Sequence, residues 1–248
     1  MPDIKDHVAI ITGGTRGIGA AIGVELAKRG VRLVVNGRTS DEEVEANLAT
    51  LRGLTKIEML HGDAANPVIA DELAKTARAR FGRIDFAVAA AGGPAPGKIT
   101  DLTAEQWMAA FDVHVHAVFH LFRAVHAALA ERGGGFLMVG SVAGIRGCPG
   151  TVAYQVVKGA LPQFARALAR DHGHEGIRVN VIEPGIIRTR FHRAMSQEAE
   201  RDNLDRRIPL RRFGTAEDVA TASLELLTNP FITGETLVID GGMSMRIV

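Results

Sequence analysis

Short apolar segments alternate along this chain with longer amphipathic ones. An unbroken apolar run of about four to eight residues is typical of a strand buried on both faces, whereas apolar positions three and four apart are typical of a helix. Val8 to Thr12 therefore predicts a strand, and Ile18 to Arg29, after a glycine-rich turn, predicts a helix. The same pattern predicts strands at 32–36, 56–60, 85–90, 136–139, 178–182 and 236–240, and helices at 41–51, 67–80, 111–131, 152–171 and 215–227, with another beginning at Thr103.

This alternation predicts an α/β protein. Strands separated by helices pair in parallel, and right-handed crossovers place helices on both faces of the sheet. The expected fold is a doubly wound, Rossmann-type parallel sheet of about seven strands. No linker, repeat or low-complexity stretch interrupts the pattern, so we expect a single domain over residues 1–248.

The segment at about 186–212 is polar, rich in arginine and poorly periodic, which favours a substrate lid. Its arginines have two interpretations. They form either a docking face for an acidic substrate or carrier protein, or a solvated lid with internal ion pairs, and the interspersed acidic residues favour the second.

Composition narrows the classes of function. The formal net charge of +1 gives no strong field towards nucleic acid. We expect no membrane span, because no apolar run reaches roughly 18 residues, and no signal peptide. Cys148 is the only cysteine, which excludes an intrachain disulfide and suits a cytoplasmic location.

A glycine-rich turn, Thr12-Gly13-Gly14-Thr15-Arg16-Gly17-Ile18-Gly19, follows the first predicted strand. Glycine permits a sharp turn and a close approach of backbone N–H groups to a pyrophosphate, and the helix start adds partial positive charge. Such a turn can also be a simple strand–helix connection. Its position at the first strand of an α/β pattern favours a dinucleotide site.

The end of the second predicted strand indicates which dinucleotide binds. NAD-selective sites usually carry an acidic residue there for the ribose 2′-hydroxyl. This chain has Asn36-Gly37-Arg38 instead. Arg38 and Arg16 can bind a 2′-phosphate through their guanidinium groups, which favours NADP over NAD; the alternative is that both are solvated.

Tyr154 is the only tyrosine and precedes Lys158 by four residues. On a helix the two side chains share a face, and an ammonium beside a phenol favours the phenolate and lowers the pKa of the tyrosine. Such a tyrosine can exchange a proton with a carbonyl or alcohol oxygen. The spacing alone is more typical of an ordinary amphipathic helix.

Together these motifs resemble those of the classical short-chain dehydrogenase/reductase family over essentially the whole chain. The glycine turn has the family form, Ser141 precedes Tyr154 at the family's interval, and Lys158 follows in place. Pro184-Gly185 with Thr189, and Asp240-Gly241-Gly242, match two further family segments. The chain is most similar to the branch of 3-oxoacyl-[acyl-carrier-protein] reductases and sugar, polyol and ketone dehydrogenases.

The resemblance implies a role for each matching residue. Tyr154 is the implied proton donor and acceptor, Lys158 its charged partner and a ligand of the nicotinamide ribose, and Ser141 the holder of the substrate oxygen. Asp63 is implied to contact the adenine. The implied cofactor-binding set is Thr12, Gly13, Thr15, Arg16, Gly17, Ile18, Gly19, Arg38, Asp63, Ala64, Ala91, Gly92, Tyr154, Lys158, Pro184, Gly185, Ile187 and Thr189.

His114 departs from the family pattern and is the fourth catalytic candidate. The family has an asparagine here that supports a water relay from the lysine to solvent. Imidazole also donates and accepts hydrogen bonds, so His114 either acts in the relay or is tolerated packing. His116 and His120 share a helix face, but no carboxylate completes a ligand pattern, so we expect packing and no metal site.

The sequence therefore predicts an NADP(H)-dependent oxidoreductase that interconverts a secondary alcohol and a carbonyl compound. Reduction of a 3-oxoacyl thioester or a small ketone is favoured; the alternatives are a sugar or polyol dehydrogenase and a non-catalytic cofactor-binding sensor. The resemblance also implies a homotetramer built through the long helices and the C-terminal strand. The expected partners are a small-molecule substrate and an acyl carrier protein, with no nucleic acid and no membrane.

Overall fold

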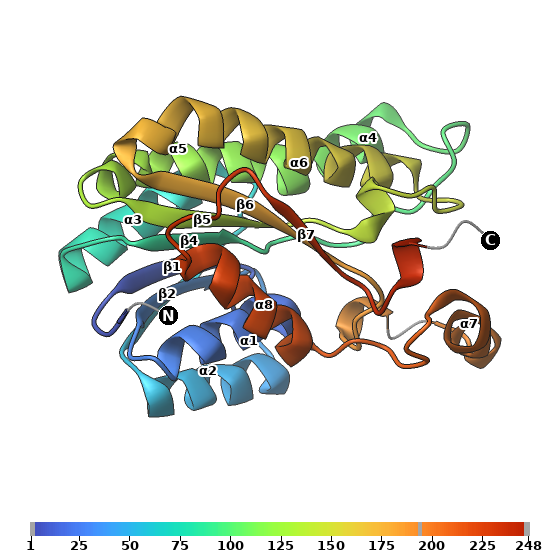
Figure 1. The fold of residues 1–248 in the computed structure, drawn as a ribbon, viewed down its shortest axis with the longest axis horizontal. Helices are drawn as coiled ribbons and strands as arrows, with labels where there is room; N and C mark the ends of the chain where they lie inside the picture. The colour runs from blue at the N-terminus through green and yellow to red at the C-terminus, as the bar shows by residue number, and fades with distance from the viewer. Residues whose placement is uncertain (1–2, 193–194, 246–248) are drawn as a thin grey trace.

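The strands form one parallel sheet with helices on both faces (Figure 1). The computed structural model describes residues 3–192 and 195–245. Within these residues the strand order is β3-β2-β1-β4-β5-β6-β7, which confirms the doubly wound α/β fold. The strands are β1 (Val8–Thr12), β2 (Arg32–Gly37), β3 (Ile57–His61), β4 (Phe86–Ala89), β5 (Gly134–Val139), β6 (Ile177–Pro184) and β7 (Thr236–Ile239).

Alternate residues of each central strand enter two separate cores. In β1, Val8 and Ile10 pack on the side of the helices α3 (Pro67–Phe81) and α5 (Ala117–Ala130). Ala9 and Ile11 pack on the side of α1 (Gly17–Ala27), α2 (Glu42–Leu54) and α8 (Ala216–Thr228). Successive strand side chains point to opposite faces, so a strand covered on both sides is apolar throughout. The helices are α1 (Gly17–Ala27), α2 (Glu42–Leu54), α3 (Pro67–Phe81), α4 (Ala104–Phe111), α5 (Ala117–Ala130), α6 (Val152–His172), α7 (Gln197–Asp202) and α8 (Ala216–Thr228).

The sequence prediction places the start of β5 at Phe136, after a glycine break, and this is wrong. The strand begins at Gly134, because Gly134 and Gly135 lie against neighbouring backbone. A Cβ at Gly134 would lie 2.5 Å from the carbonyl oxygen of Asp85, and one at Gly135 would lie 2.6 Å from that of Leu227. These glycines permit close packing of the strand.

The long helix expected at 111–131 is interrupted. A capping box between Thr103 and Gln106 starts α4, as predicted, and α4 ends at Phe111. A π-helical turn, Asp112–His116, then joins α4 to α5 and leaves His114 buried. Such turns often occur at functional sites.

One helical stretch of 27 residues, Ala104–Ala130, is long and apolar enough by length and composition to cross a bilayer. This corrects the expectation that no such stretch exists. In the structure Leu121, Phe122 and Val125 of this stretch are buried in the core over the sheet. A core helix of a folded domain therefore explains its composition, and it gives no support to a membrane span.

The expected lid, 186–212, is partly helical. It contains the turn Arg190–His192, helix α7 and a π-helical turn, Asn203–Arg207, while residues 193 and 194 lie outside the described part of the chain. Figure 1 shows α7 at one end of the sheet, apart from the two helical layers. An ion pair internal to the lid joins Arg206 to Asp202 at 3.6 Å, and two others join Arg190 to Asp41 and Arg212 to Asp218 outside it. These pairs favour a solvated lid over an open docking face, but two of these three are not internal.

Candidate active site

A cavity of about 740 Å³ lies where the loops after β1, β2, β4, β5 and β6 meet. The carboxyl ends of parallel strands form the usual ligand crevice of an open α/β sheet. Thr12 lies behind the cavity wall, where its Oγ1 donates to Val88 O and accepts from Ala91 N, each at 3.4 Å. The other predicted site residues all line the cavity: Gly13, Thr15, Arg16, Gly17, Ile18, Gly19, Arg38, Asp63, Ala64, Ala91, Gly92, His114, Ser141, Tyr154, Lys158, Pro184, Gly185, Ile187 and Thr189.

The glycine turn leaves backbone donors open to the cavity. Gly13 has φ of +64°, and a Cβ there would lie 2.8 Å from Ala91 N. A Cβ at Gly19 would lie 2.3 Å from Gly13 O, so only glycine fits both positions. Helix α1 starts at Gly17 with no side-chain cap and no acidic residue in its first turn. Its free N–H groups and partial positive charge suit an anionic pyrophosphate.

Arg16 is less available than the sequence suggests. Its guanidinium donates to both oxygens of Asp41, at 3.0 and 2.8 Å, and to Glu43 at 3.2 Å. The hydrogen bond from Arg16 is the largest cause that holds the pKa of Asp41 well below its usual range. Asp41 and Glu43 lie 25 and 27 residues after Arg16 in the sequence. No local pattern links them to Arg16, so the sequence analysis missed these contacts.

Arg38 is more open. Its side chain is 67% exposed and makes an ion pair with Asp63 at 3.3 Å. An exposed pair of this kind contributes little free energy, so Arg38 can exchange Asp63 for another anion. Of the two arginines proposed for a 2′-phosphate, Arg38 is therefore the better placed.

Tyr154 and Ser141 share a hydrogen bond beyond the C-terminal end of β5. Ser141 caps the short helix Val142–Gly144, where its Oγ accepts from Ala143 N at 3.2 Å. Burial raises the pKa of Tyr154, and the bond to Ser141 only partly opposes this. The phenol is therefore neutral at pH 7.

The expectation that Lys158 lowers the pKa of Tyr154 is wrong for this structure. The ammonium lies 5.8 Å from the centre of the tyrosine ring. It donates instead to Val139 O at 2.7 Å. Burial lowers the pKa of Lys158 itself to about 8, so the ammonium is still mostly charged at pH 7.

Glu183 is a buried acid that the sequence analysis missed. It is 0% exposed in β6, and neither carboxylate oxygen has a hydrogen-bond partner among the described residues. Burial raises its pKa to about 7, and attraction to Lys158 partly opposes that rise. A signal was available, because Glu183 is the one charged residue in the apolar run that precedes Pro184.

The imidazole ring of His114 packs against the ring of Tyr154. The two rings meet edge to face with centres 5.5 Å apart, and Nε2 of His114 lies 3.0 Å from Gly93 O. Nδ1 is buried without a partner in the described part of the chain. Burial first, and the charge of Lys158 second, lower the pKa of His114 to about 3, so the imidazole is neutral.

Part of the cavity lining is apolar, although Thr151, Asn203 and Arg207 also line the cavity. Phe191 of the lid lies with its ring centre 5.8 Å from that of Tyr154. Cys148, a free thiol, also lines the cavity, and both its N–H and carbonyl group bond to Gln155. Other apolar lining residues are Pro94, Ala95, Pro96, Val142, Met195 and Met243. They come from separate loops, so no local pattern revealed them.

Comparison with known proteins places this geometry among enzymes. The family described as Enoyl-(Acyl carrier protein) reductase matches residues 13–244. The 3-oxoacyl-[acyl-carrier-protein] reductase FabG of Escherichia coli is 34% identical over 246 residues, which cover 98% of this chain and 99% of that protein.

Solved structures agree. A short-chain type dehydrogenase/reductase from Mycobacterium ulcerans superposes with a TM-score of 0.92 at 28% identity, over 99% of this chain and 92% of that one. L-sorbose reductase from Gluconobacter frateurii, complexed with NADPH and L-sorbose, gives a TM-score of 0.89 at 26% identity, over 99% of this chain and 100% of that one.

The buried carboxyl group of Glu183 predicts a pH-dependent stability. Its pKa is raised from 4.5 to about 7, so the native state holds a proton that the unfolded state releases between those values. The free energy of unfolding therefore falls as pH rises through this window, by on the order of 2–3 kcal/mol from this group. In Glu183→Gln this contribution to the fall in the free energy of unfolding should disappear. Urea unfolding of the parent and the variant at pH 5 and pH 7.5 measures the difference.

Glu72→Gln is the control, because Glu72 is an exposed residue of α3. It should keep the same dependence on pH as the parent. An unchanged slope in Glu183→Gln would show that Glu183 is ionised in the native state throughout this range.

Proposed function

The chain belongs to the short-chain dehydrogenase/reductase family of nicotinamide-dependent oxidoreductases. Within this family we propose that it is an NADP(H)-dependent reductase of 3-oxoacyl thioesters or small ketones. The observation that carries the proposal is the single cavity in which Tyr154, Ser141 and Lys158 meet the glycine-rich turn. A non-catalytic sensor would not need this set of groups.

The residues present fit a dinucleotide. The start of α1, which has no side-chain cap, suits a pyrophosphate, as do Gly13 and Gly19, where a side chain would clash with the backbone. The exposed guanidinium of Arg38 suits a 2′-phosphate. Relatives complexed with NADPH, such as the L-sorbose reductase, support the same choice. When bound, the nicotinamide supplies the hydride that the carbonyl carbon receives.

The protein's own part is to deliver a proton to the carbonyl oxygen. Tyr154 holds its proton at pH 7, because burial raises its pKa, and so it is ready to act as a general acid in reduction. Ser141, hydrogen-bonded to the phenol, holds the same oxygen. Lys158, whose charged form Glu183 favours, places a positive charge in the same cavity.

We assign His114 to the path that returns a proton to Tyr154. The support is its buried Nδ1, which lacks a partner within the described residues, beside a neutral ring that can both donate and accept. A buried polar atom of this kind usually bonds to a protein group or to an ordered water. The packing alternative is that the ring only fills the space against Gly92, where a Cβ would lie 2.6 Å from Cε1.

The apolar side chains in the cavity lining favour an acyl chain over a polyol. A sugar needs a hydrogen-bond partner for each buried hydroxyl, and leaving one unpaired costs about 1–3 kcal/mol. Phe191, Met195 and Met243 offer no such partners, and the amide of Asn203 beside them already bonds to Ala199 O and Arg207. An acyl thioester carried by an acyl carrier protein, the substrate named for the FabG relatives, therefore fits better than a sugar of the sorbose type.

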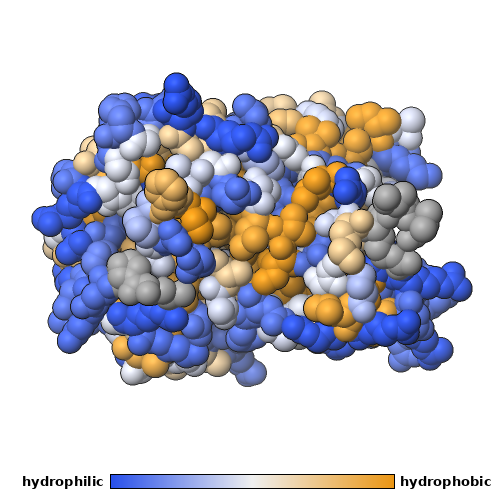
Figure 2. All heavy atoms as spheres, viewed as in Figure 1, coloured by the Kyte–Doolittle hydropathy of each residue, from blue (hydrophilic) through white to orange (hydrophobic). Residues whose placement is uncertain are grey.

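We also propose a homotetramer in the cytoplasm. Large apolar side chains lie exposed on two surfaces. Met108, Phe119 and Val156 lie on α4, α5 and α6, and Leu237 and Val238 lie in β7, with Phe231 shortly before it. Figure 2 shows apolar atoms gathered over β7. Exposed apolar patches often mark interfaces. The free thiol of Cys148 suits a reducing compartment.

Light scattering tests the proposed assembly, and a solution mass equal to that of one chain would contradict it.

Removing the phenolic hydroxyl should abolish reduction without affecting cofactor binding. We expect Tyr154→Phe to lower kcat for a 3-oxoacyl thioester by at least about a hundredfold, because general acid catalysis is lost. Its affinity for NADPH, measured by fluorescence titration, should stay within about twofold of the parent. Turnover at the parent rate would exclude the mechanism and favour the sensor alternative.

Charge reversal at Arg38 should change the choice of cofactor. In Arg38→Asp we expect the affinity for NADPH to fall by about tenfold to a hundredfold, because a charge-assisted bond to the 2′-phosphate is lost. Affinity for NADH should change far less. Arg16→Ala is the comparison: its guanidinium is already held by Asp41, so its loss should cost less. Unchanged NADPH binding in Arg38→Asp would rule out the phosphate assignment.

Two variants of His114 separate its alternatives. If His114 acts in proton return, His114→Leu should lower kcat by about tenfold or more, and His114→Asn, which keeps hydrogen-bonding groups, should restore most of the rate. Steady-state kinetics across pH 6–9 measures both. Equal rates for the leucine variant and the parent would leave His114 as packing alone.

A further inference from the structure

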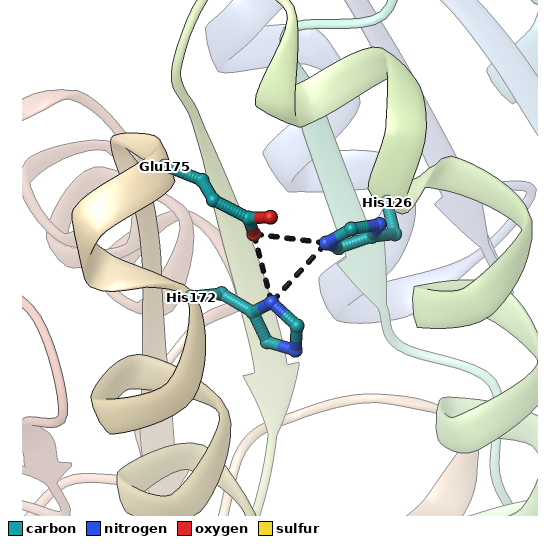
Figure 3. A group of neighbouring side chains, drawn as sticks. All are labelled: His126, His172 and Glu175. Carbon is teal, nitrogen blue, oxygen red and sulfur yellow. Dashed lines mark hydrogen bonds and ion pairs between the residues drawn. The ribbon is translucent and has the colours of Figure 1, made fainter.

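Three side chains with metal-ligating atoms meet near the ends of two helices that cover one face of the sheet (Figure 3). His126 lies near the end of α5, His172 is the last residue of α6, and Glu175 ends the short helix Gly173–Glu175. His126 Nε2 lies 2.9 Å and His172 Nδ1 2.8 Å from Glu175 Oε2. The two nitrogens are 3.1 Å apart, so the three atoms form a nearly equilateral triangle.

We propose that this triangle binds a divalent transition-metal ion, and that zinc is its occupant. Zinc takes histidine nitrogen and carboxylate oxygen at about 2.0–2.2 Å in a tetrahedral arrangement, which sets ligand atoms about 3.3 Å apart. The observed spacings are only a few tenths of an ångström shorter. The side chains therefore need to separate slightly to admit the ion, and a water molecule completes the fourth position.

The charge of the group suits a cation. Glu175 brings one carboxylate oxygen to within 2.9 Å of both imidazole nitrogens. Without a metal, the two ring nitrogens lie within hydrogen-bond distance of each other and of one carboxylate oxygen, so if both imidazoles donate to that oxygen, their two N–H groups crowd together. With the ion in place, the protons move to the outer ring nitrogens, and all three inner atoms become ligands.

The surroundings hold the ligands in place and leave them reachable. The ring of Phe122 lies 5.2 Å from that of His172, 5.8 Å from that of His126 and 5.2 Å from that of Phe136, so the imidazoles rest on an aromatic wall. The ligand side chains remain 27–32% exposed, which gives an ion access from solvent. The apolar wall on one side limits the directions from which water competes with the ligands.

The position indicates a structural role. His172 follows Lys158 by 14 residues on α6, a distance of about 21 Å along the helix. The ion is therefore remote from the cavity and links α6 to α5 at the ends opposite Tyr154 and the turn that carries His114. The site proposed here does not depend on the proposed function. The pair weighed as metal ligands in the sequence, His116 and His120, takes no part in this site, and His116 bonds to Asp112 at 2.8 Å.

The test is zinc binding by untagged protein stripped of metal with a chelator. Calorimetric titration with zinc sulfate should give one ion per chain, and zinc at about a hundred times Kd should raise Tm by about 5 °C or more. His126→Ala, His172→Ala and Glu175→Gln should each weaken zinc binding by at least about tenfold. His174→Ala is the matched control, because His174 is exposed in the same short helix and lies outside the triangle, and it should bind zinc as the parent does.

Cobalt provides a second measurement that does not involve catalysis. Co²⁺ bound to the parent should give the visible absorption of a tetrahedral nitrogen and oxygen site, and His172→Ala should lack it. A cooperative thermal unfolding transition without metal, at a Tm near that of the parent, shows that each variant is folded. No saturable zinc binding, or zinc binding that survives all three ligand substitutions, would overturn the proposal, as would equal loss in His174→Ala.

Discussion

The rest of the site depends on the contacts that hold the buried ammonium group of Lys158. A charge that is 6% exposed is costly unless polar groups surround it. Val139 O at the end of β5 accepts its hydrogen bond, and the carboxyl group of Glu183 on β6 favours its charged form. These contacts fix α6 over the ends of two strands. Tyr154, one turn earlier on the same face, is thereby held in the cavity.

The fold was predictable because its signal is local. Strands such as Val8–Thr12 are buried on both faces and therefore apolar at every position, and helix starts such as Thr103 carry their own caps. The errors arise where distant segments decide the structure. Gly134 is part of β5 at a position where the backbone of Asp85 leaves no room for a side chain. The π-helical turn at His114 has no recognisable local pattern.

The site was predictable to the extent that family motifs fix positions on the sheet. The glycine turn, Ser141, Tyr154 and Lys158 all reach one cavity as expected. Electrostatics was not predictable, because it depends on burial and on partners brought together by folding. Burial raises the pKa of Tyr154, where proximity to a lysine predicted the opposite. The triangle of His126, His172 and Glu175 joins residues up to 49 apart in sequence.

The most direct test of the central claim is a crystal structure of the chain with NADPH and an unreactive 3-oxoacyl thioester analogue. The account predicts that the 3-oxo oxygen lies within about 2.6–3.2 Å of both the Tyr154 hydroxyl and Ser141 Oγ. It also predicts that the ammonium of Lys158 lies beside the nicotinamide ribose. An oxygen bound elsewhere in the cavity, with Tyr154 out of hydrogen-bond reach, would contradict the account.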